Sequence, residues 1–193
     1  MSESGCPGFE DFAAADIEAV LAHAPFDSFF SCSEHFAGQF KFVGDALGTD
    51  CVVQKLTEVN GLFFSRAFTS DGSRNEDWYG WNMPIQAPCD CIVTSVSINS
   101  VTNSPGKVGK PPASIVEFRR EDGVHFLYAH IQDPSVKVGE TVRAGQAFAK
   151  VGNNGYGRIP HVHVGAWRDK EPLQVRWDQR TMRLPPELRQ SQD

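Results

Sequence analysis

The chain has 193 residues, of which 40% are hydrophobic and 22% charged, a composition typical of a folded globular protein with one core. Its formal net charge of −6 argues against a nucleic-acid backbone or an anionic membrane as the main partner. No apolar run approaches the roughly 20 residues needed to span a bilayer. The first residues carry neither the basic nor the apolar segment of a standard signal peptide, so the sequence as written predicts a cytoplasmic protein.

The pattern along the chain predicts one helix followed by many short strands. The segment from Phe9 to Ala24 is expected to be helical, because Ile17, Val20 and Leu21 recur at helical spacing and Pro25 ends the pattern. Short alternating or apolar runs then predict strands over residues 39–43, 51–53, 62–64, 85–96, 113–118, 124–128, 136–142, 146–151 and 161–167.

Such a series of short strands is typical of an antiparallel β-sandwich or open barrel, so we expect a mainly β fold with an N-terminal helix. Residues 99–112 hold Asn, Ser, Gly and Pro without periodicity and predict a surface loop. The predicted organisation is a helical extension over 1–24, one domain over 25–167, and a polar tail over 168–193 that packs loosely.

Five cysteines are present, an odd number that leaves at least one thiol without an intrachain partner. Their density is too low for a disulfide scaffold. Cys89 and Cys91 would share one strand face, but without a second pair nearby they are a weak metal signal. We interpret them as small buried hydrophobic residues in a reducing compartment.

The motif His161-Val162-His163, preceded by a glycine-rich run that begins at Gly152, carries most of the functional information. Side chains two residues apart on a strand point to the same face, so both imidazoles would look into one space. A neutral imidazole is a common zinc ligand and a good general base near neutral pH. Because such a pair also arises by chance, a metal site would need further histidines and a carboxylate.

Several segments in one order and spacing resemble the M23 family of zinc metallopeptidases, of the LytM and lysostaphin type with the duplicated hybrid motif fold. They are Pro84 to Val93, Phe126 to Ile131, Val136 to Gln146, Gly152 to Gly155 and Pro160 to Val164. The resemblance implies a zinc-dependent endopeptidase that hydrolyses peptide bonds, with peptidoglycan peptides of the cell wall as substrate. It also implies an extracytoplasmic location, which conflicts with the missing signal peptide.

The resemblance implies that His163 is a zinc ligand, and that His130 and His161 form a catalytic pair beside the metal-bound water. The early ligands fit two alignments. A compact one uses Asp77 as the carboxylate, but Ser73 then stands where a histidine is expected. A second one uses His35 and Asp50 and leaves no ligand missing, so we prefer a zinc site of His35, Asp50 and His163.

Two other classes of function compete with the enzyme. One is a non-catalytic member of the same fold that binds metal or cell-wall fragments, and metal content distinguishes it from a peptidase. The other is a biotinyl or lipoyl carrier domain, which residues Val136 to Gln146 also resemble. A carrier needs a modifiable lysine at a hairpin tip, and no lysine of this sequence has that setting.

Overall fold

Within residues 17–36, 38–185 and 187–188, which the computed structural model describes, the chain forms fourteen strands and two short 3₁₀-helices. The strands are β1 (Ala19–Ala22), β2 (Phe30–Glu34), β3 (Thr49–Val53), β4 (Lys55–Val59), β5 (Leu62–Arg66), β6 (Pro84–Gln86), β7 (Cys91–Ser97), β8 (Ile115–Arg120), β9 (His125–Ala129), β10 (Ile131–Gln132), β11 (Thr141–Val142), β12 (Ala147–Val151), β13 (Val162–Arg168) and β14 (Glu171–Trp177). The 3₁₀-helices are η1 (Asn75–Asp77) and η2 (Gln179–Thr181). No helix in this described part has the length and apolar character that crossing a bilayer requires.

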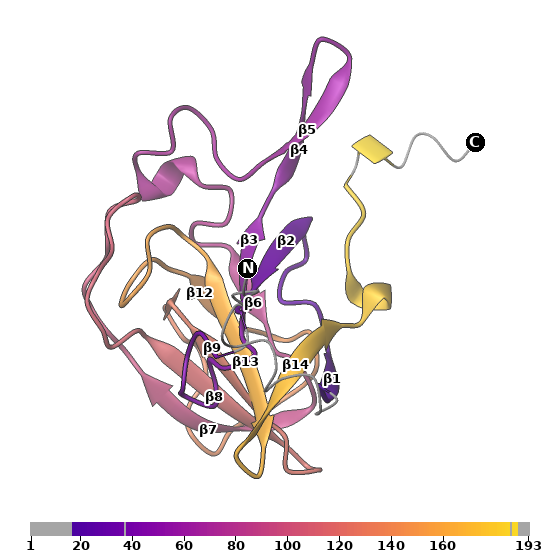
Figure 1. Ribbon diagram of the computed structural model, residues 1–193, viewed down its shortest axis with the longest axis vertical. Helices are drawn as coiled ribbons and strands as arrows, with labels where there is room; N and C mark the ends of the chain where they lie inside the picture. Colours follow the sequence, from indigo (N-terminus) through magenta and orange to yellow (C-terminus); the bar gives the residue numbers. More distant parts are fainter. Residues whose placement is uncertain (1–16, 37, 186, 189–193) are drawn as a thin grey trace, which may run out of the picture.

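The main sheet has nine strands and curls around the core (Figure 1). Its path runs β1-β14-β13-β9-β8-β7-β11, and β3 joins it beside β13 and carries β2 on its other side. All pairs are antiparallel except that of β1 with β14. Strands β4 and β5 form a separate hairpin that projects from the body. Strands β10, β12 and β6 form a third, small sheet.

The core lies between the main sheet and the small sheet. Phe148 of β12 meets Phe118 of β8 and Tyr128 of β9 edge to face, with ring centroids 4.8 and 5.3 Å apart. All three rings are fully buried. Such edge-to-face packing places the positive rim of one ring against the negative face of the next, so the aromatic cluster fixes the two sheets against each other.

Strand β13 is buried on both faces over Val162–Ala166. Val162 and Val164 point into the core, whereas His163 points to the opposite face. On one side β13 pairs with β9, and on the other its first half pairs with β3, with His163 opposite Asp50. A polar face that is buried within a sheet marks the place where a site is built.

The mainly β fold with antiparallel pairing is confirmed, but the N-terminal helix is wrong where it can be checked. Of the segment from Phe9 to Ala24, only residues from Ile17 on are described, and Ala19–Ala22 form β1. Val20 and Ala22 are buried and alternate with exposed neighbours, which is the burial pattern of a strand. The spacing of the apolar residues is therefore compatible with a strand as well as with a helix. The parallel pairing with β14 makes Ala19–Ala22 a strand.

Two further expectations are wrong. Residues 39–43 form turns and bends, because the alternating Phe40 and Phe42 line a cleft and do not pair as a strand. The chain does not pack loosely from residue 168, since β14 is paired on both sides and buries Leu173 and Val175. The division of the chain into three parts otherwise stays a prediction.

The four cysteines within the described residues are paired, so the interpretation of Cys89 and Cys91 as free buried thiols is wrong, and Cys6 lies outside the described residues. Cys89 is bonded to Cys91, and Cys32 to Cys51. The second of these bonds links directly opposite residues of β2 and β3, with Cα atoms 4.1 Å apart. This spacing is that of a non-hydrogen-bonded antiparallel pair, in which side chains approach most closely.

The Cys32–Cys51 bond closes a long stretch of chain, with a sequence separation of 19 residues. The double variant Cys32→Ser, Cys51→Ser should lower the free energy of unfolding of the metal-free protein by about 3 kcal/mol, because the unfolded chain regains the entropy of the open loop. Urea unfolding followed by tryptophan fluorescence measures this. The disulfide-bonded wild type is the reference, and the reduced wild type should be destabilised at least as much as the double variant. An unfolding midpoint in the double variant equal to that of the disulfide-bonded wild type would contradict the expectation.

Candidate functional site

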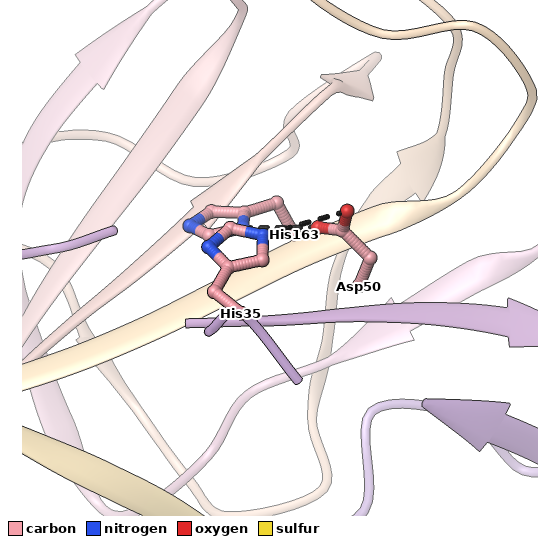
Figure 2. Close-up of side chains that lie close together, drawn as sticks. All are labelled: His35, Asp50 and His163. Carbon is pink, nitrogen blue, oxygen red and sulfur yellow. Dashed lines mark hydrogen bonds and ion pairs between the residues drawn. The ribbon is translucent and has the colours of Figure 1, made fainter. Parts of the chain in front are cut away.

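Three side chains from distant parts of the sequence meet on the polar face of β13 (Figure 2). One ligand atom from each of His35, Asp50 and His163 lies within 4.8 Å of the other two. The His163 Nδ1 is 3.0 Å from Asp50 Oδ1, and the His35 Nε2 is 3.5 Å from Asp50 Oδ2. The rings of His35 and His163 stack with centroids 5.0 Å apart, and the carboxylate of Asp50 lies beside the stack and contacts both.

Strand pairing brings these residues together. Asp50 stands opposite His163 in the β3–β13 pair and opposite Ser33 in the β2–β3 pair. His35 directly follows β2. Its backbone N–H donates to the Gly48 carbonyl at 2.9 Å, so the chain stays beside the segment that leads into β3. Neighbouring strands lie about 4.8 Å apart and side chains two residues apart share a face, so His35, two residues after Ser33, can reach the space between Asp50 and His163.

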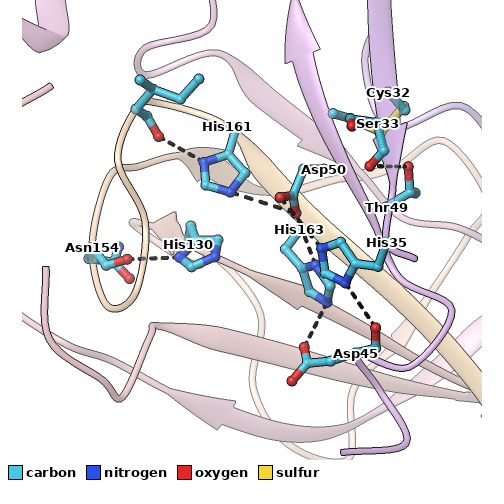
Figure 3. A network of polar contacts seen from close by, with 12 residues as sticks. Cys32, Ser33, His35, Asp45, Thr49, Asp50, His130, Asn154, His161 and His163 are labelled. Atoms are coloured by element: carbon cyan, nitrogen blue, oxygen red, sulfur yellow. Dashed lines mark hydrogen bonds and ion pairs between the residues drawn. A yellow bond between two sulfur atoms is a disulfide. The ribbon is translucent and has the colours of Figure 1, made fainter. Parts of the chain in front are cut away.

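His161 and His130 extend the cluster along the same face (Figure 3). The His161 Nε2 lies 3.7 Å from Asp50 Oδ1, and its ring centroid is 4.4 Å from that of His130. His130 joins β9 to β10 with a φ of 61°. This left-handed backbone is uncommon for a residue other than glycine and is found at functional sites more often than elsewhere.

The two imidazoles are oriented by backbone carbonyls. The Nδ1 of His161 donates to the Ile159 carbonyl and the Nδ1 of His130 donates to the Asn154 carbonyl, each at 2.7 Å. A carbonyl oxygen only accepts, so in the neutral ring the proton sits on Nδ1 and the lone pair on Nε2. Both rings thus present an Nε2 that can take up a proton.

The loop that supplies these carbonyls is held by the buried side chain of Asn154. Its Oδ1 accepts the Ser114 backbone N–H at 2.7 Å, and its Nδ2 donates to the Ile131 carbonyl at 2.8 Å. One amide therefore ties three separate segments together, which fixes the carbonyl that orients His130. Buried polar groups satisfied in this way make a site rigid.

Burial and charge shift the pKa values of the acid and the bases in different directions. Burial raises the pKa of Asp50, but the hydrogen bond from His163 and the surrounding imidazoles outweigh it and hold the pKa well below its usual range. Burial lowers the pKa of His163, but the carboxylates of Asp45 and Asp50 outweigh it and raise the pKa to about 9. Asp50 is therefore ionised, and a cation competes with a proton for the Nδ1 of His163.

The outer two histidines are shifted the other way. Burial lowers the pKa of His161, against the opposing charge of Asp50. Burial and the neighbouring His161 lower the pKa of His130 to about 3. Both rings are therefore neutral near pH 7, with their Nε2 lone pairs free.

The cluster forms the floor of a cleft of about 700 Å³. Aromatic side chains, among them the exposed Phe36, Phe42 and Tyr156, line its walls. Glu34 and Arg158 add charges of opposite sign. A cleft of this size with apolar walls and polar groups gathered at its floor is typical of a binding site for a molecule larger than water.

The donor set of His35, Asp50 and His163 fits a zinc ion. Zinc in hydrolases takes three ligands from imidazole nitrogens and carboxylate oxygens, at about 2.0–2.2 Å, and leaves a fourth position open. Ligand atoms around a tetrahedral ion of this radius are roughly 3.3 Å apart. Here His163 Nδ1 is 3.0 Å from Asp50 Oδ1 and His35 Nε2 is 3.5 Å from Asp50 Oδ2, and one ligand atom from each residue lies within 4.8 Å of the other two. Both nitrogens that face Asp50 can offer a lone pair.

The alternative carboxylate, Asp77, lies outside this cluster. It is buried in η1, where it accepts the Arg74 backbone N–H at 3.0 Å and pairs with the Arg74 guanidinium at 3.3 Å. These bonds cap the short helix and explain the burial of Asp77 without a metal. The compact alignment with Ser73 and Asp77 therefore has no geometric support.

Sequence reasoning did not find Asp45 and Asn154, which contact the candidate ligands and the flanking histidines. Asp45 lies between Gly44 and Gly48 in a turn without periodicity, so no local pattern marks it. Asn154 was seen only as part of a glycine-rich run. The glycines on both sides of Asp45 were the available signal, because they permit close backbone approach.

Comparison with known proteins places these observations in a family. Among solved structures, the chain is similar to the catalytic domain of the prophage-encoded M23 protein EnpA from Enterococcus faecalis, at 20% identity over 76% of this chain and 87% of that chain, with a TM-score of 0.47. It is similar to the catalytic domain of lysostaphin from Staphylococcus simulans, at 19% identity over 72% and 81% of the two chains, with a TM-score of 0.42. It is also similar to a zinc containing peptidase from Vibrio cholerae, at 16% identity over 72% and 50%, with a TM-score of 0.39.

No curated protein matches the sequence significantly. The profile of Peptidase family M23 matches residues 79–175, a span that contains His130, His161 and His163 and amounts to half of the sequence. His35 and Asp50 lie before the matched span. On the strength of this profile match, the chain belongs to peptidase family M23.

Proposed function

We propose that the protein is a zinc-dependent endopeptidase that hydrolyses peptide bonds of peptidoglycan. The observation that carries the proposal is the cluster of His35, Asp50 and His163 on the floor of a cleft, with two further neutral imidazoles beside it. Membership of a peptidase family supplies the class of reaction.

In this proposal His35, Asp50 and His163 hold the metal. A bound zinc ion supplies Lewis-acid polarisation of the peptide carbonyl and lowers the pKa of water toward neutrality. The chain's own contribution is to fix Asp50 of β3 opposite His163 of β13, to bring His35 beside them directly after β2, and to leave all three side chains lining the cleft.

The proton steps are assigned to His161 and His130. Each ring donates its Nδ1–H to a backbone carbonyl and keeps an unprotonated Nε2, so each can act as a general base. Once protonated, the same Nε2 donates a hydrogen bond to a developing oxyanion or to the leaving amine. We propose that one of the two rings acts as the general base and that the other donates the hydrogen bond. Since the His161 Nε2 is 3.7 Å from Asp50 Oδ1, the ion formed on that ring is stabilised by the carboxylate.

Peptidoglycan as the substrate and a location outside the cytoplasm are proposed by analogy with the family. A cleft with exposed aromatic walls suits a peptide whose small side chains leave the backbone accessible. We further propose that the protein acts outside the cytoplasm, and the Cys32–Cys51 disulfide supports this, because such bonds persist in oxidising compartments.

Metal content tests the ligand assignment. The variants His35→Ala, Asp50→Ala and His163→Ala should each lose stoichiometric zinc, because two remaining donors hold the ion too weakly. Elemental analysis of the purified proteins by mass spectrometry measures this. Asp77→Asn is the matched control and should keep its zinc. Zinc loss in Asp77→Asn with retention in Asp50→Ala would reverse the assignment of the carboxylate.

Activity tests the catalytic pair. His161→Ala and His130→Ala should keep zinc and lose about 10²–10⁴-fold in kcat/KM on peptidoglycan, the range for removing a general acid or base. His125→Ala is the control and should stay near wild type, since that ring stacks on Trp167 at 5.2 Å and does not line the cleft. Release of soluble muropeptides from purified sacculi, with mass spectrometry of the new ends, gives the rates and the cleaved bond.

The same measurements address the non-catalytic alternative. A wild-type protein that binds zinc at one equivalent and releases no fragments from peptidoglycan, and cleaves no tested peptide, would favour a member of the family that binds metal or cell-wall fragments without hydrolysis.

A further inference from the structure

We propose that Asp45 is a positioning residue that sets the tautomers of both histidines of the metal centre, His163 through its side chain and His35 through its backbone. This inference rests on the zinc site proposed above and assigns a role to a residue outside the ligand set. Figure 3 shows Asp45 reached by both rings.

The side chain of Asp45 holds His163. Its Oδ1 lies 3.0 Å from His163 Nε2, and the Gly44 carbonyl lies 3.2 Å from the same nitrogen. Both oxygens are acceptors, so Nε2 must carry the proton that they share. When the ring is neutral, its lone pair is then on Nδ1, the nitrogen that faces Asp50.

The backbone of Asp45 holds His35. The His35 Nδ1 is 2.9 Å from the Asp45 carbonyl oxygen, so this ring carries its proton on Nδ1. Its lone pair is on Nε2, which is the nitrogen 3.5 Å from Asp50 Oδ2. The two rings are thus held in opposite tautomers by one residue, and in each ring the nitrogen left free is the one that faces the carboxylate.

The loop that carries Asp45 is shaped to reach this position. Asp45 accepts the Gly48 N–H at 3.0 Å and donates its own N–H to the Phe42 carbonyl at 2.9 Å, which makes the segment a compact turn. A Cβ at Gly165 of β13 would collide with the Gly44 carbonyl, and a Cβ at Gly48 would collide with the His163 ring. The absence of side chains at these glycines therefore lets the turn lie directly on the metal centre.

Burial alone does not explain the placement of Asp45. Its side chain is 36% exposed and so gains little from an apolar environment, yet it points back at a histidine that is 4% exposed. A carboxylate that accepts the second N–H of a ligand histidine is a recurring arrangement in metal sites, where it fixes the ring and raises its basicity.

The first test is zinc affinity, measured by competition with a chromophoric chelator. Asp45→Ala should weaken zinc binding about 10–100-fold, the range found when such partners are removed. Asp45→Asn should lose less, because an amide oxygen still accepts the His163 proton without the charge. Asp133→Ala, which removes a carboxylate that pairs with Lys150 on the surface, is the control and should bind zinc as the wild type does.

The second test is the proton positions in the zinc-loaded protein, read from long-range ¹H–¹⁵N correlations of the imidazoles. The wild type should show His163 protonated at Nε2 and His35 at Nδ1. In Asp45→Ala the His163 Nε2 proton should lose its low-field shift and exchange faster with water, while His35 should keep its pattern, because the backbone carbonyl remains. A general loosening of the loop would instead change the imidazole signals of His163 and His35 together.

The outcomes separate this inference from the proposed function. Stoichiometric zinc in the wild type with unchanged affinity in Asp45→Ala would overturn the role of Asp45 and leave the metal centre standing. Complete zinc loss in Asp45→Ala, as in Asp50→Ala, would make Asp45 a ligand and also overturn it. A wild type that binds no zinc would remove the metal centre and this inference with it.

Discussion

The register of β3 against β13 is the constraint on which the site depends. It sets Asp50 opposite His163, and the pairing of β2 with β3 then brings His35 to the same place. A slip of one residue would turn every side chain of a strand to the other face, so the carboxylate would point into the core. The buried valines of β13 oppose such a slip, because Val162 and Val164 would have to leave the core. The hydrophobic core thus determines where the polar cluster forms.

Around this cluster, each of the four imidazoles has one nitrogen bonded to a protein oxygen and the other directed to the site. His35, His130 and His161 donate to backbone carbonyls, and His163 donates to a carboxylate and a carbonyl. Backbone carbonyls do not titrate and move only with the chain. The proton pattern of the site is therefore determined largely by the fold, with the side chain of Asp45 accepting from His163 Nε2.

How much of this could be predicted differs between local and non-local features. The strand that carries His163, and the hairpin of β8 and β9, follow from alternation and turn residues within a short window, although β13 begins at Val162, directly after His161. The metal cluster of His35, Asp50 and His163 was expected only from family resemblance, because no local pattern relates positions so far apart. The sequence pattern predicts a helix where β1 lies, because only its pairing with β14 makes that segment a strand. No local pattern marks Asp45, because only its contact with His163 gives it a place in the site.

The parallel pairing of β1 with β14 has a consequence for how the domain can be divided. The span matched by the family model begins at residue 79 and ends at residue 175, within β14. The outer edge of β14 is covered by Ala19–Ala22, which lie before that span. A fragment cut to the matched span would leave that edge bare and would also lack His35 and Asp50, two of the three candidate metal ligands. An uncovered strand edge offers its backbone to other molecules and promotes aggregation. Strand β1 therefore belongs to the same folding unit as β14.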